Sequence, residues 1–340
     1  MWSLNNQTPY AAERGWIRDN NGAEVWIVAV KATYDILPDG ATVLSKQQER
    51  INSGVVLYPD SEEVRYETDL GPEKDSTDVV LNGHAWAPEG NPVSSLVVGL
   101  KVGDVTRLAR VQGDRIWDGN GYCAPVPFDK LPLRANRMSV SSGEAGEDAN
   151  PLGIPIMKSP RKDISRLPNI EFIGSNAGAD IGFGPVPRHW PARLRYAGTY
   201  DQRWENMRSP LLPEDFDPHF WQTAPASQYA GGLLRGGEIV TLANMTSPEF
   251  SYARVLSFAI PKISLGLITR FFDGSSQSHR ARMHTLIIEP DYPRISVVWH
   301  SALPCHHLVN QLESTLITEK KRLMLRLAPL PTAFREWESL

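Results

Sequence analysis

Short apolar runs separated by turns are the feature that most limits how this chain can fold. Its 27 prolines and 26 glycines lie mostly between such runs. Residues 24–36 are rich in β-branched and aromatic side chains, and the turn 38–40 (Pro-Asp-Gly) leads into a second run at 41–44. Because Pro and Gly fix turns while β-branched and aromatic residues favour strands, this region predicts a strand, a turn and a strand.

The same pattern recurs along the chain. It predicts a meander over 79–86, 94–102 and 105–117, and further strands at 239–242, 263–272, 281–289 and 295–299. No amphipathic helix of three or more turns is expected before residue 305. Leu308, Leu312 and Leu316 are four apart and would permit one short helix, although residues 314–318 favour a strand.

The predicted fold class is therefore mainly β, with two antiparallel β-sandwich or open-barrel domains joined by long ordered loops rich in Pro, Gly and aromatic residues. A chain of 340 residues suits one large or two medium domains. We expect an N-terminal β-domain at 1–138, an irregular boundary at 139–165 and a C-terminal β-domain at 166–320. The structure of the tail at 321–340 is left undecided by the sequence.

Composition excludes several partners. The net charge is −4, and the basic residues are scattered among acids, which argues against nucleic acid or an anionic membrane as the main partner. The apolar run 25–30 is too short to span a membrane and lies beyond the position of a signal sequence. Two cysteines, Cys123 and Cys305, fit a reducing compartment. We therefore expect a cytoplasmic protein.

The region at 167–228, here called the aromatic segment, is dense in Pro, Gly, Trp, Phe and Arg but has neither a helical nor a strand period. Flexible linkers lack aromatic residues, so this stretch is expected to be an ordered loop with packed rings. Long ordered loops are uncommon and are more often functional than not. If the protein has a site, we expect the aromatic segment to build or border it.

Metal, cofactor and nucleophile chemistry find little support in the sequence. Cys305, His306 and His307, with His300 upstream, suggest a metal site only superficially, because adjacent histidines in an extended chain point to opposite sides. Cys123 and Cys305 carry no signature of a nucleophile. No Walker loop, GxGxxG, GxSxG or HExxH motif occurs in the sequence. We expect no metal and no cofactor.

Acidic residues in the aromatic segment allow a glycosidase-like alternative. Glu214, Asp215 and Asp217, together with the many tryptophans, could serve a pair of catalytic carboxylates and a sugar-stacking surface. The competing interpretation is that Asp215 and Asp217 accept hydrogen bonds from turn amides beside two prolines. In the same way, the aromatic rings are either anchors of a long loop or parts of a protein-binding surface.

Three stretches of the aromatic segment resemble the central signature of a bacterial family: LPNIE at 167–171, GFGPVPRHWPARLRYAGTYDQRW at 182–204 and SPLLPEDFDPHFWQTAP at 209–225. That family is catalogued as a domain of unknown function and is encoded in type VI secretion clusters, beside genes for the VgrG spike and the PAAR spike tip. Similar flanking motifs extend the resemblance over about residues 10–318. The chain departs from the family pattern at 135–148.

The resemblance implies a non-enzymatic cytoplasmic adaptor or chaperone. Such a protein holds a secreted toxic effector, often a PAAR-linked one, and helps to load it onto VgrG. A carbohydrate-binding or carbohydrate-active protein and a structural component of the secretion spike are the alternatives. Under the adaptor hypothesis the partner-binding residues are expected among Phe183, Trp190, Tyr200, Trp204, Arg208, Phe216 and Phe220, with full burial of these side chains as the competing explanation.

Overall fold

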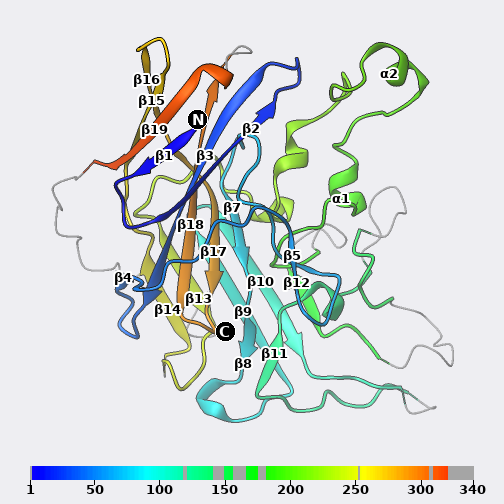
Figure 1. Ribbon diagram of the computed structural model, residues 1–340. Coiled ribbons are helices and arrows are strands. Elements are labelled where there is room, and N and C mark those ends of the chain that lie inside the picture. Colours follow the sequence, from blue (N-terminus) through cyan, green and yellow to red (C-terminus); the bar gives the residue numbers. More distant parts are fainter. Residues whose placement is uncertain are drawn as a thin grey trace.

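The computed structural model of the chain describes residues 2–117, 121–140, 149–155, 166–174, 181–251, 253–305 and 309–320. In these residues strands and loops dominate, and three larger sheets organise the molecule (Figure 1). The largest has the order β2–β3–β18–β17–β7, with β4 also paired to β3. Its strands are β2 (Ala11–Arg18), β3 (Glu24–Ile36), β4 (Thr42–Leu44), β7 (Asp78–Leu81), β17 (Arg282–Glu289) and β18 (Arg294–Pro304).

The second sheet has five strands in the order β12–β10–β9–β13–β14, and the third has four in the order β1–β19–β15–β16. The five-stranded sheet consists of β9 (Ser95–Val102), β10 (Val105–Gln112), β12 (Ile170–Ile173), β13 (Ile239–Ala243) and β14 (Val255–Ala259). The four-stranded sheet consists of β1 (Ser3–Asn6), β15 (Leu265–Phe271), β16 (Ser276–Arg280) and β19 (Leu312–Glu319).

Smaller elements complete the described chain. Two short ladders pair β5 (Val56–Leu57) with β6 (Val64–Tyr66), and β8 (His84–Trp86) with β11 (Lys130–Pro132). The α-helices are α1 (Pro191–Leu194) and α2 (Gln202–Met207), and single turns of 3-10 helix occur at Pro88–Gly90, Ala135–Arg137, Pro218–Trp221, Ala226–Gln228 and Val309–Gln311. No helix in the described ranges is long and apolar enough to cross a membrane.

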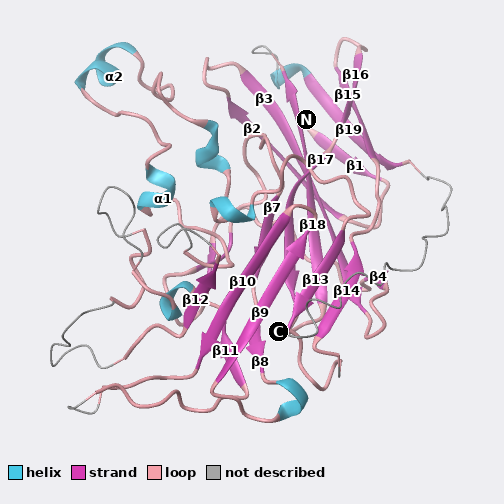
Figure 2. Ribbon diagram, turned by 180° about the vertical axis from the view of Figure 1, so that it is seen from behind, coloured by secondary structure: helices cyan, strands magenta, loops and turns pink. Residues whose placement is uncertain are grey.

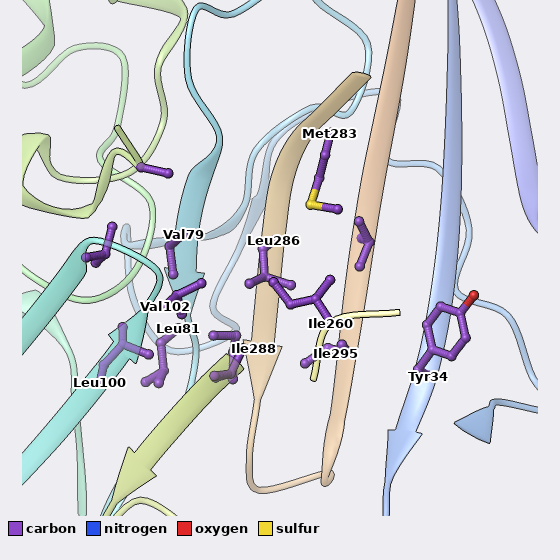
Figure 3. Close-up of a cluster of buried hydrophobic side chains, with 14 of the residues drawn as sticks. Tyr34, Val79, Leu81, Leu100, Val102, Ile260, Met283, Leu286, Ile288 and Ile295 are labelled. Atoms are coloured by element: carbon purple, nitrogen blue, oxygen red, sulfur yellow. The ribbon is translucent and has the colours of Figure 1, made fainter. Parts of the chain in front are cut away.

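The main core lies between the six-stranded and the five-stranded sheets. Alternate residues of β3, such as Val28 and Val30, and of β17, such as Leu286, share one apolar cluster with Leu100 and Val102 of β9. Figure 3 shows side chains from β7, β17, β18 and β9 meeting in this layer. Strand side chains alternate between the two faces of a sheet, so the other half of β3, β17 and β18 points away from this core.

The four-stranded sheet closes one end of the core. Leu267 of β15 and Ile317 of β19 belong to the same apolar cluster. Trp26 of β3 is fully buried, and its ring nitrogen donates a 3.0 Å hydrogen bond to the hydroxyl of Thr315. Seen from behind, the loops that carry α1 and α2 stand to one side of the sheets (Figure 2).

The predicted fold class, mainly β, is confirmed. The run expected at 24–36 is β3, and the ladders between the described strands are antiparallel except for β1 with β19 and β7 with β17. The meander expected over 79–117 is wrong, because these strands do not pair in sequence within one sheet. β7 lies in the six-stranded sheet, while β9 and β10 form a hairpin in the five-stranded sheet.

The helix allowed by the leucine spacing at 308–316 is also wrong for the described residues. Residues 312–319 form β19, which pairs with β1 on one side and β15 on the other. The alternation of this strand places Thr315 and Ile317 in fully buried positions. Tertiary pairing on both edges outweighs the four-residue spacing of the leucines.

Strands from both sides of the predicted boundary at 139–165 share all three larger sheets. β3 pairs with β18, β9 pairs with β13, and β1 pairs with β19. One continuous apolar cluster joins these strands. The ranges 1–138 and 166–320 therefore do not have separate sheets.

Candidate functional site

The aromatic segment forms a loop layer beside the six-stranded sheet (Figure 1). Its described part contains α1 and α2 and is fixed by buried anchors. Phe183 is fully buried and packs its ring 5.0 Å from that of Phe172 on β12. Trp190 lies in a second, smaller apolar cluster with Ile181 and Val186. In the described residues the segment is mostly loop with packed rings, as its composition predicted, but residues 170–173 form strand β12 of the five-stranded sheet, which the prediction missed.

The seven residues predicted to bind a partner divide into two groups. Phe183, Trp190 and Phe216 are buried, so for these three the competing explanation, that the ring defines the fold, agrees with the structure. Tyr200 is 53% exposed and packs edge-on against Trp204, with ring centroids 4.7 Å apart. The remaining members, which are Trp204, Arg208 and Phe220, are half-buried.

Trp204 and Arg208 hold together a projecting part of the segment, residues 199–212, here called the arm. The indole nitrogen of Trp204 donates to the carbonyl of Leu211 at 2.8 Å. The guanidinium of Arg208 donates to the carbonyls of Leu212, at 2.8 Å, and of Asn20 in the β2–β3 turn, at 2.6 Å. Both side chains use their polar groups inside the molecule, and Arg208 fastens the arm to the end of β2.

Buried ion pairs connect the outer face of the six-stranded sheet to the loops that cover it. Asp78 of β7 is fully buried and accepts hydrogen bonds from Lys74, at 2.6 Å, and from the amide and hydroxyl of Thr223 in the aromatic segment. Lys31 of β3 pairs with Asp69 at 3.0 Å. We call this set of buried charges the polar layer.

Glu67 is the member of the polar layer that contacts the aromatic segment most closely. Its carboxylate pairs with Arg193 at 2.8 Å and with Arg188 at 2.9 Å. Burial opposes ionisation of Glu67, but the hydrogen bond from Arg193 and the two guanidinium charges outweigh it and hold the carboxyl pKa below its usual range. At Asp69 burial outweighs the Lys31 and Lys74 charges and the hydrogen bond from the amide of Asn52, and it raises the pKa of the carboxyl.

Two histidines with stacked rings lie next to the ion pairs of the polar layer. His284 sits at a bulge in β17 and His300 lies on β18, with ring centroids 4.8 Å apart. Both line an inner pocket of about 30 Å³, room for a single water. Burial, with a contribution from the Lys74 charge, lowers the pKa of His300 to about 3, and burial lowers that of His284 well below its ordinary value. Both rings are neutral at neutral pH, so neither offers a proton there.

The candidate metal ligands do not converge in the residues that the structure describes. His300 faces the polar layer, whereas Cys305 belongs to the apolar core on the other side of the sheet. His306 and His307 lie outside the described residues. No group of three or more metal-binding side chains is found in the described ranges. Cys123 is half-buried, and its sulfur accepts a 3.2 Å hydrogen bond from the amide of Ile116.

The acidic residues of the aromatic segment serve local turns. Asp217 accepts a hydrogen bond from the amide of His219 at 2.9 Å, and Asp215 accepts from the amide and hydroxyl of Thr199. These bonds lower the pKa of both carboxyls, whereas a catalytic acid needs a raised one. Glu214 is exposed and lies 3.6 Å from Arg203. The interpretation of Asp215 and Asp217 as turn residues therefore fits the structure.

An open cleft of about 510 Å³ lies where β2, the loop before β7 and the aromatic segment meet. We call it the β2 cleft. It is lined by Ile17, Arg18 and Asp19 from β2 and its turn, by Ser53–Val55, Thr68 and Leu70–Pro72 from the loop, and by Arg188, Pro210–Leu212 and Trp221 from the aromatic segment. Apolar side chains and two arginines dominate this lining.

Both the aromatic segment and residues far from it in sequence build the cleft. The aromatic segment contributes Arg188, Leu211 and Trp221 to the lining, and the expectation that it borders a functional site stays a prediction. Sequence reasoning missed Ile17 and Arg18, because the short polar run 11–18 has no clear strand period. Only its pairing with β3 brings these residues beside the aromatic segment.

The chain is thus a mainly β protein in which the aromatic segment forms one side of an open cleft. A family model described as "Uncharacterized protein conserved in bacteria (DUF2169)" matches residues 21–300, which is most of the chain. The chain belongs to this family. No curated protein and no solved structure matches it.

Proposed function

We propose that this protein is a cytoplasmic adaptor that holds a secreted effector and helps to load it onto the VgrG spike of a type VI secretion system. The resemblance of its signature motifs to a family encoded beside VgrG and PAAR genes suggests the biological setting. The observation that supports a protein-binding role is the β2 cleft, which is open and is walled by the signature segment itself.

The chemistry of the cleft suits a protein partner. Trp221 and Arg188 lie together on one wall, with the guanidinium 5.9 Å from the ring centroid. Leu211 and Ile17 add apolar surface, and Val55 at the rim is 45% exposed. Aromatic and arginine side chains around an apolar pocket are the residues that dominate binding energy at protein interfaces.

An adaptor must also release its client. A cleft of this size accepts a few side chains, which favours an interface of standard or smaller area over a permanent one. The arm and the walls are held by internal hydrogen bonds and ion pairs, so the cleft needs little ordering when a partner enters. Affinity would then depend on a few anchors and could be reversed when the spike is assembled.

The test is co-expression with the genes that neighbour this one, followed by measurement of the affinity for any effector among their products. Replacing Val55 by Asp puts a charge at the rim of the cleft, and we expect affinity for the effector to fall by about tenfold or more. Val43 on β4 is exposed to a similar degree but lies outside the cleft. Val43→Asp is therefore the matched control and should bind like wild type.

Other outcomes would point to other functions. If both folded variants bind the effector at wild-type strength, the cleft is not the binding site. If the wild-type protein captures no effector but co-purifies with VgrG in fixed proportion, the structural-component alternative is supported. Stabilisation of the protein by cell-wall glycans, without any protein partner, would support the carbohydrate alternative.

A further inference from the structure

β2 is the outer strand of the six-stranded sheet. It pairs with β3 on one side, and no other described strand is hydrogen-bonded to its second side. Figure 1 shows β2 at the border of the sheet, on the side of the arm. A free edge of eight residues presents unpaired amides and carbonyls, which is a template for another strand unless the protein blocks it.

The ladder decides which groups of β2 face outward. The amide of Asp19 donates to the carbonyl of Ala23, so 19 and 23 are a hydrogen-bonded pair. The carbonyl of Glu24 accepts from Cys305 of β18, so the next pair, 18 and 24, is not hydrogen-bonded. Because the two kinds of pair alternate in an antiparallel ladder, Trp16 and Arg18 direct their amides and carbonyls away from β3.

The outward groups lie beside the cleft. Ile17 and Arg18 line it, and Trp16, which lies on the same face of the strand as Arg18 and opposite to Ile17, is 40% exposed. Farther along the edge, the Glu13 carboxylate accepts the amide of Arg14 at 3.0 Å and blocks that position. The open part of the edge is thus the stretch that borders the β2 cleft.

Arg18 is the group at this edge with which an acidic side chain of an occupant can pair. The carboxylate of Asp19 accepts the amides of Asn21 and Ala23, and Arg188 is paired with Glu67. Arg18 is exposed and has no ion pair among the described residues. A positive group is therefore left beside an apolar cleft and a row of unpaired backbone groups.

We propose, building on the adaptor function above, that an extended segment of the protein partner adds as a strand to the free edge of β2. Its backbone pairs with the outward groups of Trp16 and Arg18. Apolar side chains on one face of the segment enter the β2 cleft, and an acidic side chain pairs with Arg18. Main-chain pairing of this kind supplies affinity, while the pocket for alternate side chains supplies specificity.

Proline at position 16 tests the backbone contact directly. Trp16→Pro removes an outward amide and no bond to β3, and the preceding Gly15 tolerates a following proline. Trp16→Val removes the same ring and keeps the amide. With the co-purified neighbouring effector as probe, we expect Trp16→Pro to bind about tenfold more weakly than Trp16→Val. Equal affinities of the two folded variants would overturn strand addition.

Hydrogen exchange on the wild-type full chain gives a second readout that needs no variant. The amides of Trp16 and Arg18 should exchange more slowly in the effector complex than in the free protein. Binding of the effector without this protection overturns strand addition and leaves the adaptor function standing. Failure of the effector to bind at all overturns both. Protection that grows with the concentration of the protein alone would identify a second copy as the occupant and overturn the proposed partner.

Discussion

At the scale of single residues, the aromatic segment is held by charges as much as by rings. Arg193 in α1 is 2% exposed and bridges three parts of the molecule. It pairs with Glu67 in the loop before β7 and donates to the carbonyls of Val186 and Phe220. A buried carboxylate that loses its partner carries a large desolvation penalty, so this one guanidinium fixes the wall of the cleft.

Arg193→Ala is expected to lower the free energy of unfolding by about 3–5 kcal/mol, because it leaves Glu67 buried with Arg188 as its remaining cation. Arg203 in α2 is the matched control, since its pair with Glu214 is exposed on both sides. Removing an exposed pair changes stability by about 1 kcal/mol or less. Urea unfolding followed by tryptophan fluorescence measures both, and equal losses would show that Arg193 is not a structural anchor.

At the scale of elements, the neighbouring strands β17 and β18 present His284 and His300 to the buried polar layer. Their folded-state pKa values are lowered, that of His300 to about 3, while the unfolded chain titrates near 6.5. The unfolded state therefore binds more protons between these values. Stability is fully present above about pH 6.5 and is lost as the pH falls toward the folded-state values.

We expect the free energy of unfolding to fall between pH 6 and pH 4 with a contribution of about 1.4 kcal/mol per pH unit from each histidine. In the double variant His284→Gln, His300→Gln the free energy of unfolding should change less between pH 6 and pH 4. Urea unfolding at these two pH values measures the change. His219→Gln alters an exposed histidine outside the stacked pair and serves as the substitution control. A slope in the double variant equal to that of wild type contradicts the assignment.

Elements differ in how far the sequence could predict them, and the reason is burial. β3 was predictable because most of its residues are β-branched or aromatic and all but two are buried. β2 was not, because its half-buried and exposed residues do not alternate regularly along the strand. The β2 cleft depends on that strand and on the docking of the arm through Arg208. The sequence could therefore predict only the side of the cleft that the aromatic segment forms, and not the side formed by β2.

At the scale of the whole molecule, the first and last described strands lie side by side in the four-stranded sheet. β1 pairs with β19, and the hydroxyl of Tyr10 donates to Glu319 at 2.9 Å. A composition change at 139–165 suggested a boundary there, yet sequence composition carries no information about which distant strands pair. Because every larger sheet draws strands from both halves, we expect folding of each half to depend on the other.

Fragments test this dependence. In the fragment 1–138, β3 lacks β18 and β9 lacks β13, so long apolar edges are left unpaired. We expect 1–138 and 139–340, each expressed alone, to show no cooperative thermal unfolding by circular dichroism. Co-expression should restore a soluble complex with a single transition, because the missing partner strands are then supplied. A sharp transition in either isolated fragment would mean that its sheets form without the other half. The β2 cleft, which needs β2 and the aromatic segment together, would then be assembled from two independent domains.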